Sequence, residues 1–427
     1  MTSAQVVVLV LLGLSLLAAV TTGQPLYYRL VYFWLVLFFG SWIWAALSLR
    51  GLRLFRSART LRAQVGQVFE EKFEVINDNR IIRLWLEVKN ESPLPDSGGS
   101  QVLTLIGGKQ RRIYWSHTLL TQRGVFPLGP TVMTSGDLFG LFPKSVNVPV
   151  KESLLVYPLM VDVQVFPDPA GLLPGGESLR RRTHQITPNA SGVREYAPGD
   201  SLNRIHWVST ARRNRLIVKE FELDPLAEVW VFLDSARYEH VALPSPVQEF
   251  NVLDFWRKTV KVSLPPSTEE YSVSIAASLS RHFLRRGRAV GLANAGRYLT
   301  LLPPDRGGRQ LGKILEALAV SRAEGNLPIR GLVETQGKHV PKGSILIIIT
   351  PTVQPEFAIL VEYILRRGTR PVAVLLDPST FGGPQSNASL VEKVQLLGIP
   401  VCHISNGDNL EVALVEGMSK RVLYPSI

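Results

Sequence analysis

Residues 344–350 read Ser-Ile-Leu-Ile-Ile-Ile-Thr, and this stretch decides the fold class of the C-terminal half of the chain. Its aliphatic residues follow one another without polar alternation, which is typical of a strand buried on both faces of a parallel sheet. A second such run, Val-Trp-Val-Phe-Leu, stands at 229–233. Both runs end in polar residues, so we expect two neighbouring strands with polar side chains at their carboxyl ends.

Helical periodicity separates these and further apolar strands throughout residues 227–427. Helices are predicted near residues 268–286, 310–322, 355–367, 388–397 and 409–418, and additional strands at 289–293, 371–376 and 400–404. Strands that alternate with helices form an α/β, parallel, doubly wound sheet. Because ligands of such sheets bind beyond the carboxyl ends of the strands, Asp234-Ser235 and Thr350-Pro351-Thr352 are the first places to look for a site.

Residues 63–165 show instead the alternation of half-buried strands. Phe-Glu-Glu-Lys-Phe-Glu-Val at 69–75 and Leu-Trp-Leu-Glu-Val at 84–88 are bounded by turn-forming residues. Short strands with frequent turns predict a small antiparallel β-sandwich-like domain. Segments 123–130 and 137–142 carry glycines and prolines that suit turns and bulges, and we expect Phe139, Leu141 and Phe142 in the core.

Two uncharged apolar stretches, residues 4–22 and 30–49, begin the chain. Twenty helical residues rise about 30 Å, roughly the hydrocarbon thickness of a bilayer. Five arginines follow the second stretch: Arg50, Arg53, Arg56, Arg59 and Arg62. Positive flanks mark the cytoplasmic side, so residues 1–50 are predicted to form a two-pass hairpin in the plasma membrane, with both termini and the folded domains cytoplasmic. A signal peptide is the alternative, but Met1 to Gln5 lacks its basic start.

The composition restricts the chemistry. The chain has 427 residues, a formal charge of +12 and a single cysteine, Cys402, which excludes an internal disulfide and a cysteine-based zinc cluster. Cys402 lies in an apolar strand, where a buried small residue is expected rather than a nucleophile. There is no His-Glu-x-x-His, Gly-x-Ser-x-Gly or phosphate-loop motif. We therefore expect neither catalytic residues nor a cofactor.

Residues 192–222, here called the signature segment, lie between the two predicted domains, within a linker at 166–226. From residue 180 to 222 the chain carries nine Lys or Arg and four Asp or Glu, a local net charge of +5. Asp200 or Ser201 can cap a short helix. Leu202, Ile205 and Val208 would form its apolar side, and residues 216–221 would form a strand. Aromatic residues are too few for us to expect nucleic-acid binding.

The signature segment has two interpretations, which are not exclusive. Its arginines can fasten the neighbouring domains together, or they can form a surface that binds a partner. The residues concerned are Arg194, Tyr196, Gly199, Asp200, Arg204, Trp207 and Arg212.

The same residues resemble the family catalogued as domain of unknown function 58. Its pattern runs Arg-x-Tyr-x-x-Gly-Asp, then Arg-Ile-x-Trp, then Ala-Arg, and stands here at 194–200, 204–207 and 211–212. Asn203 replaces a further arginine that many members carry. Segments 123–130 and 137–142 and the order of hairpin, β domain, signature segment and α/β domain also resemble the family.

The resemblance implies a von Willebrand factor A-like domain at 227–427 and a partnership with MoxR-type AAA+ ATPases. It also implies proximity to a transglutaminase-like membrane protein and a role in protein assembly, maturation or secretion. Von Willebrand A-type domains use Asp-x-Ser-x-Ser to bind a divalent cation. Here Ala236 and Tyr238 stand at the two serine positions, which leaves Asp234, Ser235 and Thr350 as an incomplete ligand set. A capped strand end is therefore the preferred interpretation there.

These observations favour a membrane-anchored, non-enzymatic adaptor or scaffold. The alternatives are a divalent-metal-dependent ligand-binding module and a hydrolase with an unrecognised site.

Overall fold

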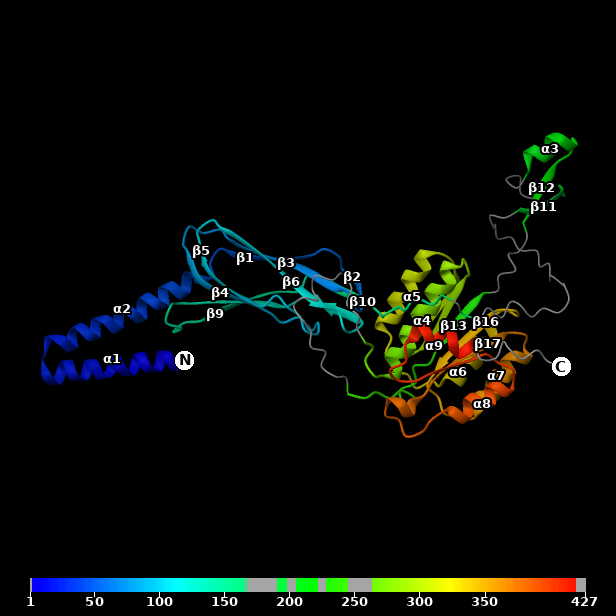
Figure 1. Cartoon of the computed structure of the whole chain (residues 1–427). Helices are drawn as coiled ribbons and strands as arrows, with labels where there is room; N and C mark the ends of the chain where they lie inside the picture. The colour runs from blue at the N-terminus through cyan, green and yellow to red at the C-terminus, as the bar shows by residue number, and fades with distance from the viewer. Residues whose placement is uncertain are drawn as a thin grey trace. The chain divides into compact units, whose positions relative to one another are not determined.

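The computed structural model describes residues 2–164, 166, 190–197, 205–221, 228–244 and 263–419. The chain separates into two compact units. Unit 1 comprises residues 1–160, 244–277 and 313–321, and unit 2 comprises residues 161–243, 278–312 and 322–427. Helices and strands are numbered in chain order, and Figure 1 labels them where there is room.

Unit 1 begins with an antiparallel pair of helices, α1 (Ser3–Thr22) and α2 (Pro25–Ser48) (Figure 1). Thr2 caps α1 in a reciprocal capping box with Gln5, and Gly23, at φ 71°, ends it in the left-handed conformation that glycine adopts without strain. Both helices are long and apolar enough to cross a membrane. The two apolar stretches expected from the sequence are thus helices that could span a membrane.

The second helix is held to the β-strands by one arginine. Arg83 donates from its two terminal nitrogens to the carbonyl oxygens of Leu47 and Arg50, each at 2.6 Å. Carbonyl groups at a helix C-terminus have no partner within the helix, and a cation is well placed to bind them. Burial lowers the pKa of the Arg83 guanidinium.

A β-sandwich follows the helices, as the sequence predicts. One sheet has the order β1 (Leu52–Ala58), β3 (Val68–Asn77) and β6 (Arg111–Leu119), and the other β5 (Gln101–Ile106), β4 (Arg83–Asn90), β8 (Thr131–Ser135) and β9 (Lys144–Val148). All pairs in both sheets are antiparallel. Their facing side chains form one apolar core, made by Leu52, Val75, Leu86, Val88, Ile106 and Met133.

A third sheet departs from the all-antiparallel expectation. It has the order β2 (Arg62–Gln64), β10 (Ser153–Tyr157) and β7 (Gly124–Pro127), and β2 runs parallel to β10. A parallel pair needs a long connection, and here the rest of the sandwich lies between the two strands in sequence. Two paired strands this distant cannot be recognised from local alternation.

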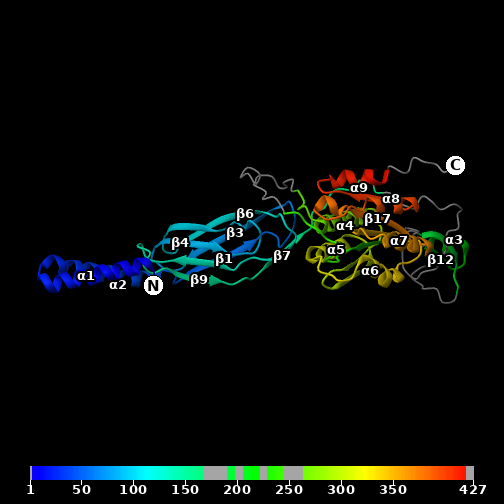
Figure 2. The ribbon, with the colours of Figure 1, turned by 90° about the horizontal axis from the view of Figure 1, so that it is seen from below.

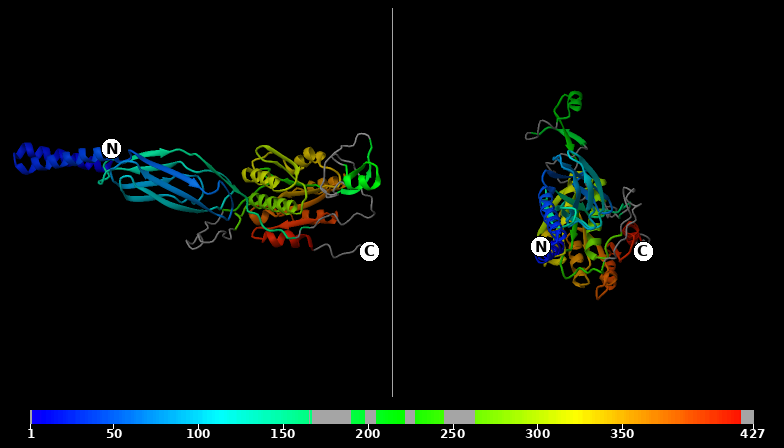
Figure 3. Two further views of the ribbon diagram at one scale, coloured as in Figure 1. Left: turned by 90° about the horizontal axis from the view of Figure 1, so that it is seen from above. Right: turned by 90° about the vertical axis from the view of Figure 1, so that its left-hand side faces the viewer.

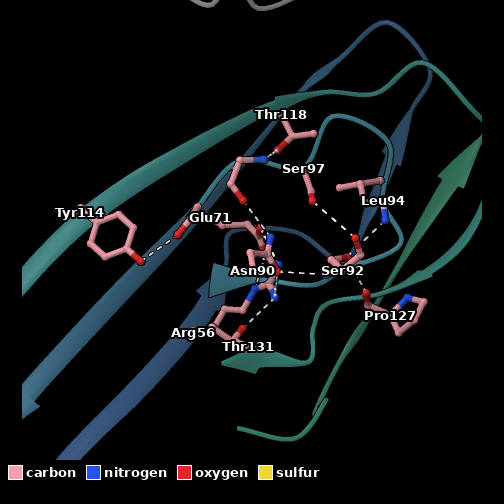
Figure 4. A network of polar contacts seen from close by, with 12 residues as sticks. Arg56, Glu71, Asn90, Ser92, Leu94, Ser97, Tyr114, Thr118, Pro127 and Thr131 are labelled. Carbon is pink, nitrogen blue, oxygen red and sulfur yellow. Dashed lines mark hydrogen bonds and ion pairs between the residues drawn. The ribbon is translucent and has the colours of Figure 1, made fainter. Parts of the chain in front are cut away.

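Buried polar side chains also connect the strands of the sandwich (Figure 4). Arg56 of β1 holds Glu71 of β3 through two hydrogen bonds of 2.7 and 2.8 Å. Arg56 also donates to Asn90 of β4 at 3.0 Å, and Asn90 in turn donates to the carbonyl oxygen of Gly98 at 2.8 Å. A bidentate ion pair with further hydrogen bonds is the arrangement in which buried charges are tolerated.

Arg123, immediately before β7, connects all three segments of unit 1. Its side chain is 0% exposed, and it pairs with Glu269, at 2.6 Å, and with Glu270. It also donates to the carbonyl oxygens of Leu318, at 3.2 Å, and Ser321, at 2.8 Å. The sequence-based expectation treated 123–130 only as a turn and bulge, and this role of Arg123 was missed.

Unit 2 contains a six-stranded sheet that includes the five strands predicted from the sequence. Its order is β15 (Leu299–Asp305), β14 (Val290–Ala295), β13 (Val229–Leu233), β16 (Ile345–Thr350), β17 (Arg370–Leu376) and β18 (Val401–Ile404). Five strands are parallel, but β15 is antiparallel to β14 and was not predicted. Pro303 and Pro304 make β15 hard to recognise as a strand in the sequence. Both prolines are tolerated because β15 lies at the edge of the sheet.

Helices flank this sheet on both sides (Figures 2 and 3). The five predicted helices are present as α4 (Thr268–Arg285), α5 (Gly308–Val320), α7 (Glu356–Arg366), α8 (Ala388–Leu396) and α9 (Leu410–Ser419). A sixth, α6 (Ile329–Gln336), was not predicted. Apolar residues of α6, α7 and α8 share one core with Trp230, Phe232 and Ile348 of the sheet. Helices on both faces explain the uninterrupted apolar strands.

Candidate functional site

Asp234 and Thr350 meet at the carboxyl edge of the sheet, as the parallel register of β13 and β16 requires. Asp234 is only 2% exposed. One of its carboxylate oxygens accepts the Thr350 hydroxyl at 2.6 Å, and the other accepts the backbone N–H of Ala236 at 3.0 Å. Both oxygens therefore already have a partner within the chain, which is the arrangement of a capped strand end.

The Asp234 carboxyl lies in an environment that resists ionisation. Burial raises the pKa of Asp234 to about 7, although the hydrogen bond from Thr350 partly opposes the shift. Burial also raises the pKa of Glu239, against a hydrogen bond from Thr352. A divalent cation that bound there would have to displace the proton from the Asp234 carboxyl, so binding would depend on pH.

Ser235, the third member of the incomplete ligand set, directly follows Asp234 in the chain. Ser235 is buried, and its carbonyl oxygen accepts the N–H of Gly325 at 2.9 Å. Within the described ranges, no three His, Cys, Asp or Glu side chains gather closely enough to hold a metal ion.

A second polar cluster, missed in the sequence, lies at the ends of β17 and β18. Asp377 accepts hydrogen bonds from the hydroxyls of Ser379, at 2.8 Å, and Ser386, at 2.9 Å. Asn387 donates to the carbonyl oxygen of Leu376 at 2.7 Å, and its side-chain oxygen lies 3.0 Å from Nε2 of His403. These contacts cap strands and short turns. The only signal in the sequence was the polar residues after each strand.

The signature segment forms a separate small element within unit 2. Strands β11 (Ala190–Glu195) and β12 (Ile217–Phe221) pair in antiparallel fashion, and helix α3 (Trp207–Arg213) contacts β12 (Figure 1). Arg194 lies in β11 opposite Val218, and the N–H of Tyr196 donates to the carbonyl oxygen of Leu216 at 2.9 Å. The predicted positions Gly199, Asp200 and Arg204 lie outside the described residues.

The prediction that Ile205 lies on the apolar side of the short helix was wrong. The described helix α3 begins at Trp207, and His206 is its N-cap and accepts the N–H of Ser209 at 3.3 Å, whereas Asp200 and Ser201 lie outside the described residues. Ile205 lies before the helix, buried, in an antiparallel bridge with Val218. An apolar residue with helical spacing can equally complete a bridge, and local periodicity does not separate the two cases.

Helix α3 presents its side chains to solvent. None of its residues is buried, and Trp207 is 67% exposed. Val208 and Leu216 are exposed as well, and so are Arg212, Arg213 and Arg215. We call these six residues the α3 surface. A helix with an exposed tryptophan and no buried residue gains little from packing in the chain itself.

A family model described as protein of unknown function DUF58 matches residues 192–242, which run from β11 past Asp234. The uncharacterized protein YeaD of Bacillus subtilis (strain 168) is 25% identical over 231 residues. That match covers 53% of this chain and 50% of YeaD, so it spans about half the length of this relative.

Solved structures give only distant likenesses. The CARDB domain of the PF1109 protein from Pyrococcus furiosus, solved in complex with di-metal ions, is 14% identical, with a TM-score of 0.18. The likeness covers 25% of this chain and 91% of that domain. A cycloisomaltooligosaccharide glucanotransferase from Paenibacillus sp. is 10% identical, with a TM-score of 0.15, over 75% of this chain and 44% of the enzyme. Scores this low carry no argument about fold or function.

Proposed function

We propose a function from the premise that this chain belongs to the DUF58 family. The protein is a membrane-anchored adaptor without catalytic activity, which binds a partner protein through the α3 surface. Helices α1 and α2 supply a two-pass anchor with both termini and the folded units in the cytoplasm. Residues 227–427 serve as a von Willebrand A-like domain.

One observation carries this proposal, namely the exposure of Trp207 on a short helix that also carries the exposed Arg212 and Arg213, with Arg215 two residues further along the chain. Tryptophan and arginine are the residues most enriched among those that dominate the energy of protein interfaces. Trp207 offers a large apolar area to a partner, and the arginines add orientation toward an acidic surface.

The proposed partner is a MoxR-type AAA+ ATPase, with a transglutaminase-like membrane protein as a further member of the assembly. This choice rests on the family resemblance, and the basic charge of the α3 surface requires an acidic patch on the ATPase. An adaptor of this kind would hold the ATPase near the membrane while a client protein is assembled or matured.

Co-purification of the full-length protein with the ATPase in detergent tests the proposal. We expect Trp207→Ala and Arg212→Glu each to reduce the retained ATPase strongly. Matched controls are Trp115→Ala and Arg309→Glu, because both side chains are exposed outside the α3 surface. Equal retention by all four variants, or no retention by the wild type, would refute the adaptor role.

A second candidate is a divalent-metal-dependent ligand-binding module, favoured only by the 2.6 Å contact between Asp234 and Thr350 at the carboxyl edge of the sheet. Calorimetry with Mg²⁺ or Mn²⁺ separates the two candidates. Heat that saturates in the wild type and disappears in Thr350→Val would favour the metal-dependent module, and no heat at millimolar metal would eliminate it.

A further inference from the structure

The loop at residues 137–142 exposes two large apolar side chains, those of Leu138 and Phe139, to solvent. The buried carboxylate of Asp137 accepts the backbone N–H groups of Phe139, at 2.9 Å, Leu141, at 3.2 Å, and Phe142, at 2.7 Å. Three hydrogen bonds to one carboxylate fix the loop backbone. Leu138 is 68% and Phe139 61% exposed, so the expectation that Phe139 is a core residue was wrong, whereas Leu141 is buried.

This loop touches both apolar helices of unit 1. The ring of Phe142 lies 5.1 Å from the ring of Phe38 in α2, edge to face. The hydroxyl of Thr2, the cap of α1, donates to the carbonyl oxygen of Leu141 at 3.1 Å. Between the loop and the helices runs an open, mostly apolar groove of about 360 Å³, lined chiefly by Val7, Val8, Trp34, Leu37, Phe139 and Leu141.

The position of these contacts along the helices gives the depth of the loop. Val7 is four residues into α1 from Ser3, or about 6 Å along the helix axis. Phe38 stands ten residues before the end of α2 at Ser48, or about 15 Å inside that apolar helix. Apolar side chains of membrane-surface elements typically reach about 5–10 Å into the boundary between headgroups and acyl chains.

We propose that the Asp137-braced loop is a third membrane contact, and that lipid acyl chains occupy the groove and cover Leu138 and Phe139. This inference rests on the proposed membrane anchor. The loop packs against the parts of α1 and α2 that would lie in the bilayer. The lipid around those helices would therefore also surround the exposed side chains of the loop. Lipid is therefore the occupant that the continuity of the apolar surface favours.

Nitroxide labels on the full-length protein in phosphatidylcholine–phosphatidylglycerol nanodiscs test the proposal, in a Cys402→Ala background. Labels are placed at Phe139→Cys and, in case that variant does not fold, at Leu138→Cys. Trp115→Cys, 57% exposed on β6 of the same unit, is the aqueous control, and Val10→Cys on the exposed face of α1 reports the anchor itself. The measurement is the ratio of collision rates with oxygen and with a water-soluble nickel complex.

We expect a ratio several-fold higher at 138 and 139 than at 115, approaching that at 10. An aqueous ratio at 138 and 139, with a lipid ratio at 10, overturns the third contact and leaves the anchor intact. An aqueous ratio at 10 refutes the anchor and the third contact together. Circular dichroism of each labelled variant confirms that it is folded.

Discussion

Arg123→Ala should selectively loosen the two distant segments that complete unit 1. The wild-type guanidinium is 0% exposed and lies between Glu269 and Glu270, which are 23% and 20% exposed. Removal of one partner from a buried ion pair costs about 3–5 kcal/mol, because the charge that remains has lost its compensation. Both glutamates reach some solvent, so we take the lower value, about 3 kcal/mol.

Hydrogen exchange measured by mass spectrometry on the full-length protein in detergent micelles is the suitable assay. It reads local opening, whereas a single unfolding transition is not expected for two units. A loss of about 3 kcal/mol corresponds to roughly 150-fold faster exchange of peptides within 268–277 and 313–321. The control is Arg330→Ala, which removes a solvent-screened pair with Glu334 on the exposed face of a helix and should change exchange there only slightly.

The reasoning would be refuted if the exchange rates within 268–277 and 313–321 rose no more in Arg123→Ala than the rates at the α6 helix rise in Arg330→Ala. Arg123 would then be buried without stabilising these segments. The variant Arg123→Leu with Glu269→Gln and Glu270→Gln separates charge from shape. We expect it to exchange more slowly than Arg123→Ala, since no uncompensated carboxylate remains.

Three further outcomes follow from other buried groups. The pKa of Asp234, about 7 in the folded state, lies above its ordinary value of 3.8, so stability should fall as pH rises from about 4 to 7. Asp234→Asn should flatten this dependence in thermal unfolding followed by circular dichroism at pH 5 and 8. Burial raises the pKa of the Cys402 thiol to about 12, so maleimide should label the denatured protein at pH 7 and spare the native one. Arg83→Leu should speed hydrogen exchange at residues 45–52, because the end of α2 loses two charge-assisted hydrogen bonds worth about 1.5–3 kcal/mol each.

Sequence patterns predicted the elements whose signals are local. The aliphatic run at 344–350 became β16, flanked on both sides by parallel strands, because an unbroken apolar strand is stable only when both faces are covered. The five helices α4, α5, α7, α8 and α9 were found from their periodicity, whereas α6 was missed. The parallel β2–β10 pair and β15 were missed, since a distant pairing and a proline-containing edge leave no periodic signal.

The candidate site was predictable only in part. Topology alone placed Asp234 beside Thr350, because parallel strands bring their carboxyl ends to one edge. The buried Arg123 and the braced loop at 137–142 could not be derived, because each depends on partners distant in sequence or on where a loop points. Residues 138–142 look like core by composition, and only the backbone held by Asp137 turns Leu138 and Phe139 outward.

The three-segment construction of unit 1 also has a consequence during synthesis. Its last segment ends at residue 321, which is 321 − 48 = 273 residues after the end of α2. At about 5–20 residues per second, roughly 14–55 s pass between the two points. A membrane hairpin would therefore be inserted well before Arg123 can meet Glu269 or Ser321. During that interval the sandwich is without the two later segments that Arg123 contacts in the finished unit.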